Sequence, residues 1–120
     1  MATVLTDREL LEQAAKAAGL NVEWHFGCGN ALAYVEKNAS PHLFWNPLND
    51  DGDALRLAVK CGIDLHTWPL MSGTQSSDPW VRACIDRLGR CCQERALDDA
   101  NAAARRAIVR AAAAIGRAMP

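Results

Sequence analysis

The segment that most constrains the fold is residues 45–57, which read WNPLNDDGDALRL. An apolar stretch meets a rigid Asn46-Pro47 corner, because proline fixes φ and pushes the preceding residue into an extended conformation. Three aspartates then occupy the start of a helical pattern, where carboxylates complement the positive end of the helix dipole, and Asn49 is the expected N-cap. The segment therefore predicts a strand, a corner and a helix in the middle of the chain.

Composition predicts one packed domain over residues 1–120. Half of the residues are apolar and 22% are charged, so a core is expected and global disorder is not. A chain of 120 residues buries roughly two-thirds of its unfolded surface. The net charge of −1 and the pI near 6.3 argue against a dedicated binder of polyanions such as nucleic acid.

The sequence carries no signal for a membrane or for export. It has no apolar run long enough to cross a bilayer. Residues 1–7 lack the basic and apolar regions of a signal peptide, so we expect a cytoplasmic protein. The five cysteines form an odd set without a framework spacing, and in a reducing compartment they are expected to be free thiols: Cys28, Cys61, Cys84, Cys91 and Cys92.

Three helices are expected, at residues 7–18, 50–61 and 99–117. Thr6 and Glu9 have the spacing of a capping box at the first helix, and Gly19 is placed to close it. The second helix should end at Gly62, and Asp98 or Asp99 should cap the third. The third helix is dense in alanine, which favours helix strongly.

The strands are expected from residues that alternate between apolar and polar. Residues 22–26, 31–36 and 42–45 are separated by short turns, one of them at 27–30, which predicts an antiparallel meander. A short strand is expected at 63–66, and residues 69–79 should form the longest loop. Together with the helices, these strands predict an α+β fold in which an antiparallel sheet is covered by helices.

Residues 80–96 leave two alternatives open. Segments 80–86 and 91–96 around Gly89 favour a second hairpin, and two upstream prolines would interrupt a helix. A helix competes, because Val81, Cys84, Ile85 and Leu88 also fit a helical period. We expect the hairpin.

Motifs for metal binding and catalysis are incomplete. With Gly52 as the sixth residue of a calcium loop, the first and twelfth positions would be Pro47 and Ala58, which supply no side-chain oxygen. His25 and Cys28 form a single H-x-x-C pair, and the second half of a zinc site is missing. The same two residues suggest a nucleophile and base of a small hydrolase, without any supporting signature. We therefore expect no cofactor, no metal and no catalytic residue.

Two surfaces are candidates for recognition. Trp68 and Trp80 flank the long loop and are candidate contacts with a protein partner. The arginines of the last helix are expected to be a solvated face; as an alternative they would contact nucleic acid: Arg105, Arg106, Arg110 and Arg117. The last helix, whose small side chains Ala102 and Ala113 are expected to stay partly outside, or an edge strand would also allow a homodimer; a monomer is the competing expectation.

Two stretches resemble a known family. Residues 45–59, with the Asn-Pro corner and acidic helix start, and residues 104–113, which read ARRAIVRAAA, resemble small phage and prophage proteins with the phage ABA-sandwich domain. The Nin-region X proteins of lambdoid phages are similar. The resemblance implies a three-layer α/β/α arrangement and a bacterial cytosolic setting, and it implies no activity. We therefore expect an accessory protein that binds another protein without catalysis.

Overall fold

The fold comes from a computed structural model that describes residues 5–20, 22–28, 31–36, 44–67, 80–96 and 99–120. For residues 23–28, 31–36 and 44 the structure describes the backbone alone. The elements follow in the order α1 (Asp7–Ala18), β1 (Val22–Cys28), β2 (Ala31–Glu36), β3 (Phe44–Trp45), α2 (Asp51–Cys61), β4 (Asp64–Thr67), β5 (Trp80–Ile85), a 3-10 turn (Asp86–Leu88), β6 (Arg90–Arg95) and α3 (Ala100–Ala118).

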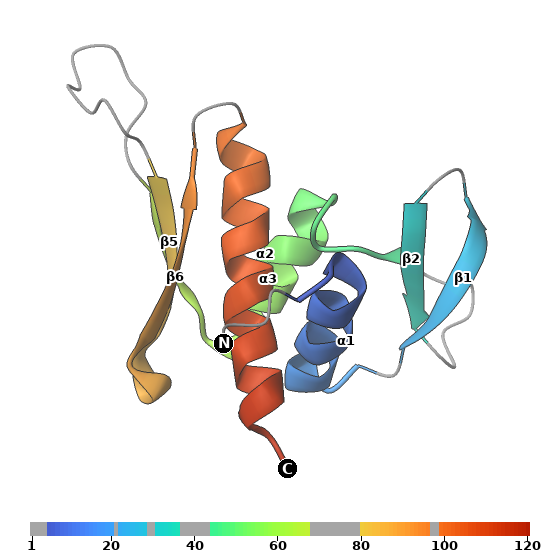
Figure 1. The fold of residues 1–120 in the computed structure, drawn as a ribbon, viewed down its shortest axis with the longest axis horizontal. Coiled ribbons are helices and arrows are strands. Elements are labelled where there is room, and N and C mark those ends of the chain that lie inside the picture. Colours follow the sequence, from blue (N-terminus) through green and yellow to red (C-terminus); the bar gives the residue numbers. More distant parts are fainter. Residues whose placement is uncertain (1–4, 21, 29–30, 37–43, 68–79, 97–98) are drawn as a thin grey trace.

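The strands form two antiparallel sheets with the helices between them. One sheet has the order β1-β2-β3 and the other β4-β5-β6. In Figure 1 the second sheet lies at one end of the molecule, α3, α2 and α1 follow, and the first sheet lies beyond α1. The expected α+β class, with helices covering an antiparallel sheet, is confirmed. The layer order is sheet, helices, sheet, which differs from the α/β/α order that the resemblance implies.

The C-terminal helix α3 is the central element of the core. It packs on α1 on one side and on β5 and β6 on the other. We expected Ala102 and Ala113 to stay partly outside as a surface for a second copy. Ala102 is half-buried, but Ala113 is only 1% exposed. The alanines serve close packing within this chain, so the expectation of a low-bulk face on α3 is wrong at Ala113.

The corner before α2 is held by side chains on both of its arms. The Asn46 backbone N–H donates to the Asp53 carboxylate at 2.9 Å, and the Asn46 side chain accepts from the Leu48 N–H at 3.1 Å. The N-cap is Asp50, whose carboxylate accepts from the Asp53 N–H at 2.8 Å. The expected N-cap at Asn49 is therefore wrong by one residue, because the turn after Pro47 uses one more residue before the helix begins.

The other helix ends agree with the sequence. Thr6 and Glu9 make both bonds of the capping box. Gly19 and Gly62 adopt the left-handed conformation at the ends of α1 and α2, with φ of 70° and 67°. Asp99 caps α3 by accepting from the Ala102 N–H; Asp98 lies outside the described residues.

The strand predictions are confirmed within the described ranges. The segment around Gly89 is a hairpin, as expected, and β4 pairs with β5 on its other side. β1 continues through Cys28 after a register irregularity, so the expected turn at 27–30 begins later than predicted. Residues 37–43 and 68–79, which include the first half of the third expected strand and the long loop, lie outside the described residues.

One pair of cysteines departs from the expectation of free thiols. Cys84 and Cys91 are joined by a disulfide. The hairpin register places them directly opposite one another, with their Cα atoms 4.1 Å apart. Cys61 and Cys92 are free. The expectation treated each cysteine separately and did not use the strand pairing that brings two of them together.

None of the helices in the described part of the chain combines the length and hydropathy that a bilayer crossing needs.

Candidate binding groove

Of the two tryptophans expected to contact a partner, Trp80 lies in the described part of the chain. Trp68 lies outside the described residues. Trp80 begins β5 and is half-buried, and the Arg82 guanidinium lies 4.5 Å from the centre of its ring. Cation–π stacking of this kind fixes both side chains on the sheet surface. His25 and Cys28 belong to β1, where side chains are not described.

The arginines of α3 serve different parts of the fold. Arg105 has a side chain that is only 16% exposed and reaches the corner before α2. It donates to the Leu48 carbonyl at 2.8 Å and to the Asp51 carboxylate at 2.6 Å. Arg105 therefore ties α3 to α2, and the expectation of a solvated face is wrong for it.

Arg106 and Arg110 share the carboxylate of Glu94 on β6. Arg110 hydrogen bonds to one oxygen of Glu94, and the Arg106 Nε lies 3.6 Å from the other. Arg106 also donates to the Asp7 carboxylate at 3.0 Å. Arg110 donates in addition to the Gln93 carbonyl at 2.9 Å. These bonds link α3 to β6 and to the start of α1.

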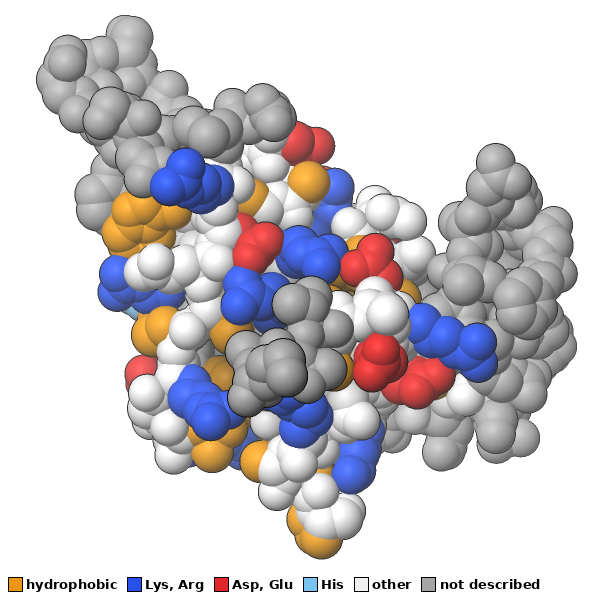
Figure 2. Space-filling model, viewed as in Figure 1, with side chains coloured by type: hydrophobic (Ala, Val, Ile, Leu, Met, Phe, Trp, Pro, Cys, Tyr) orange, Lys and Arg blue, Asp and Glu red, His pale blue; other side chains and the backbone are white. Residues whose placement is uncertain are grey.

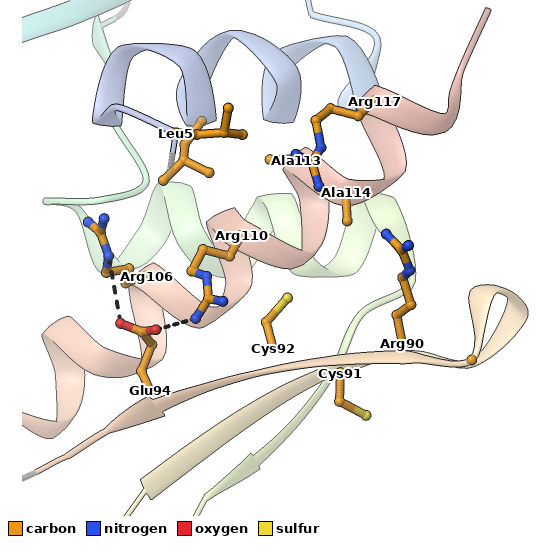
Figure 3. A pocket seen from close by; sticks show the side chains of 12 residues that line it. Leu5, Arg90, Cys91, Cys92, Glu94, Arg106, Arg110, Ala113, Ala114 and Arg117 are labelled. Atoms are coloured by element: carbon orange, nitrogen blue, oxygen red, sulfur yellow. Dashed lines mark hydrogen bonds and ion pairs between the residues drawn. The ribbon is translucent and has the colours of Figure 1, made fainter. Parts of the chain in front are cut away.

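A groove lies between β6 and α3, with a volume of about 790 Å³. Figure 3 shows arginine side chains from both elements around it, with Leu5 at one side and the Cys92 thiol directed inward. The lining includes apolar side chains and one acid beside four arginines: Leu5, Leu10, Ala113, Ala114, Glu94, Arg90, Arg106, Arg110 and Arg117. The groove is thus cationic with an apolar floor.

Two of the four arginines have no acidic partner among the described residues, so they are available to pair with a ligand. Arg106 and Arg110 are engaged by Glu94, as described above. Within the described part of the chain, Arg90 and Arg117 make no ion pair, and both side chains are exposed. Figure 3 shows them on the two walls at the same end of the groove, Arg90 from β6 and Arg117 from α3. A carboxylate between them would be held from both sides.

The thiol of Cys92 is half-buried on the β6 wall. Burial raises its pKa above the ordinary value, because the thiolate loses hydration there. Arg110, Arg90 and Arg117 oppose this effect, since positive charge stabilises the thiolate, and Glu94 adds to it. The pKa of Cys61 is likewise raised, chiefly by burial. Thiols with raised pKa are poor nucleophiles at neutral pH.

The arrangement supports binding more readily than catalysis. The groove holds donors for an anion, whereas burial raises the pKa of its one thiol and the nearby Glu94 carboxylate raises it further, so the thiol is held in its protonated form. The described residues also contain no group of three His, Cys, Asp or Glu side chains that could hold a metal. Figure 2 shows basic side chains interleaved with acidic ones over this face of the molecule.

The sequence pattern points to only part of this groove. It indicates Arg106, Arg110 and Arg117 but not Arg90 or Glu94. The alternation of β6 places Arg90, Cys92 and Glu94 on one face, and that signal was present. The alternation of side chains along β6 does not reveal that this face packs on α3. Comparisons with family models, curated proteins and solved structures find no match to the chain.

Proposed function

We propose that this chain is a non-catalytic binding protein whose groove between β6 and α3 takes an acidic segment of a partner protein. The observation that carries the proposal is the end of the groove at Arg90 and Arg117, where two guanidinium groups from different elements have no ion-pair partner among the described residues. Guanidinium groups favour carboxylates because their donors match the two oxygens. The apolar floor would accept the aliphatic part of the same segment.

The cellular setting belongs to the same proposal. We propose that the chain acts in the cytoplasm of a bacterial host as an accessory protein, which the resemblance of residues 45–59 and 104–113 to phage and prophage proteins supports. In that compartment the glutathione pool would favour the reduced form of Cys84 and Cys91. Pairing of these cysteines would then depend on the redox state of the host.

Binding is tested with a fluorescently labelled peptide of alternating glutamate and valine, measured by anisotropy. Its control is the same peptide with glutamine in place of glutamate. We expect the acidic peptide alone to bind, and Arg90→Gln with Arg117→Gln to weaken it about tenfold or more, since each charge-assisted bond contributes about 1.5–3 kcal/mol. The matched control is Arg8→Gln with Arg87→Gln, which removes the same charge outside the groove.

Two results would overturn the proposal. Equal loss in both double variants would mean that net charge, not the groove, attracts the peptide. Tighter binding of a single-stranded oligonucleotide, with a steep salt dependence that is lost on changing Arg106 and Arg110, would favour the nucleic-acid alternative.

A further inference from the structure

The backbone of β6 has one edge that no described strand covers. The sheet order is β4-β5-β6, so β6 is an edge strand. It spans Arg90–Arg95 and pairs with β5 along its whole length. Edge strands present unpaired N–H and C=O groups, which are a template for another extended chain.

Two observations show which backbone N–H and C=O groups of β6 point away from β5. The Gln93 carbonyl accepts from Arg110 Nη1 at 2.9 Å, so it points away from β5. Cys84 and Cys91 lie opposite each other with Cα atoms 4.1 Å apart, as in the closely spaced pairs that exchange no backbone hydrogen bonds. Since the pattern alternates, the N–H and C=O groups of Cys91 and Gln93 are directed to the free edge.

That free edge forms one wall of the groove. The lining includes Cys91, although Figure 3 shows its side chain directed away from the groove, so the contact is through its backbone. Arg110 crosses from α3 to reach the Gln93 carbonyl. The cationic side chains and the outward backbone groups of Cys91 and Gln93 therefore face the same space.

We infer that the acidic segment binds as an added strand on the free edge of β6, with its carboxylates directed to Arg90 and Arg117. This inference rests on the proposed function and specifies how the segment is held. A backbone N–H of the added strand takes the position of Arg110 Nη1 at the Gln93 carbonyl. Strand addition provides affinity through the backbone, and the arginines select acidic side chains on the groove side.

The charges around the edge favour this occupant. The groove contributes four arginines against one glutamate, so an acidic chain is attracted and a basic one is repelled. A second copy of this chain would bring the same arginines to the edge, which opposes pairing of two β6 strands.

The test compares Gln93→Pro with Gln93→Ala, using the alternating glutamate–valine peptide. Proline removes an N–H that points to the free edge and is absent from the β5 ladder, so the hairpin should persist. We expect binding to weaken about tenfold in Gln93→Pro, which loses one backbone bond and gains a steric block, and to be unchanged in Gln93→Ala. Equal affinity of the two variants would overturn the inference.

N-methylated peptides keep the test decisive if Gln93→Pro fails to fold. Methylation of alternate peptide amides blocks one edge of the added strand, so one of the two methylation phases should abolish binding to the native protein and the other should not. Equal binding of both phases would contradict strand addition. Loss of binding in the Arg90 and Arg117 variant with no effect of Gln93→Pro or of methylation would leave the proposed function standing and overturn this inference alone.

Hydrogen exchange supplies an independent readout. On peptide binding, the amides of Cys91 and Gln93 should become protected, whereas those of Arg90, Cys92 and Glu94, which the register directs to β5, should be protected with or without peptide. Protection of the first set without peptide, in a protein whose mass is twice that of the chain, would assign the edge to a second copy and overturn the inference.

Discussion

Gly116 of α3 lies directly against the backbone of Gln13 in α1. A Cβ atom at Gly116 would be 2.0 Å from the Gln13 carbonyl oxygen. This distance is far below any van der Waals contact, and the neighbouring atoms are backbone, which cannot rotate away. The glycine is therefore required for the close approach of the two helices, which the surrounding alanines extend.

Gly116→Ala should destabilise the protein although alanine is the better helix former. Alanine gains about 1 kcal/mol in helix propensity, whereas forcing the helices apart costs about 1–3 kcal/mol and more where backbone must move. We expect a net loss in the free energy of unfolding, measured by urea denaturation. Gly52→Ala in α2 is the matched control, because its Cβ would meet only side-chain atoms, at 3.2 Å. Stabilisation by both substitutions would contradict the proposed contact.

The elements were predictable because their signals are local. The capping box at Thr6, the glycines that close α1 and α2 and the turn at Gly89 each depend on a few neighbouring residues. The disulfide was also predictable, because a hairpin centred before Gly89 places Cys84 opposite Cys91. This pairing can be predicted only after residues 80–96 have been assigned to a hairpin.

The groove depends on contacts that no local pattern reveals. Arg105 hydrogen bonds to Asp51, and Arg106 to Asp7, although the partners are far apart in sequence. A stripe of arginines on an isolated helix resembles a solvated face, and only the packing of β6 on α3 shows that Glu94 lies opposite two of them. The division into two sheets was equally hidden, since every strand pair is antiparallel and short connections suit either arrangement.

Asp53 should be the most important carboxylate for stability at the corner before α2. Its side chain is 12% exposed, accepts from the Asn46 N–H at 2.9 Å and pairs with Arg56 at 2.7 Å. Asp53→Ala should lower the free energy of unfolding by about 1–3 kcal/mol, because the Asn46 N–H loses its acceptor. Asp51→Ala is the control: its side chain is 72% exposed, and the loss should be about 1 kcal/mol or less. Thermal or urea denaturation measures both, and equal losses would contradict the role of Asp53.

The Cys92 thiol should react slowly near neutral pH. Burial raises its pKa, so the reactive thiolate forms only at higher pH than in an unstructured peptide. The rate of alkylation by iodoacetamide, followed by peptide mass spectrometry, should therefore rise with pH to a midpoint above that of the peptide. Glu94→Gln should move the midpoint to lower pH, since the carboxylate disfavours the thiolate and the neighbouring arginines favour it. A midpoint at or below the peptide value would show that the thiol is not shielded.

The disulfide between Cys84 and Cys91 should stabilise the hairpin that forms one wall of the groove. The two cysteines are seven residues apart, and closing a loop of this size contributes about 2–3 kcal/mol in the chain-entropy account. A reductant should therefore lower the thermal midpoint by roughly 10 °C. Cys91→Ser should show the lower midpoint with or without reductant, because its partner thiol has nothing to pair with across the strand. Equal midpoints for the oxidised and reduced native protein, together with a free thiol at Cys84, would show that the pair is a dithiol in solution.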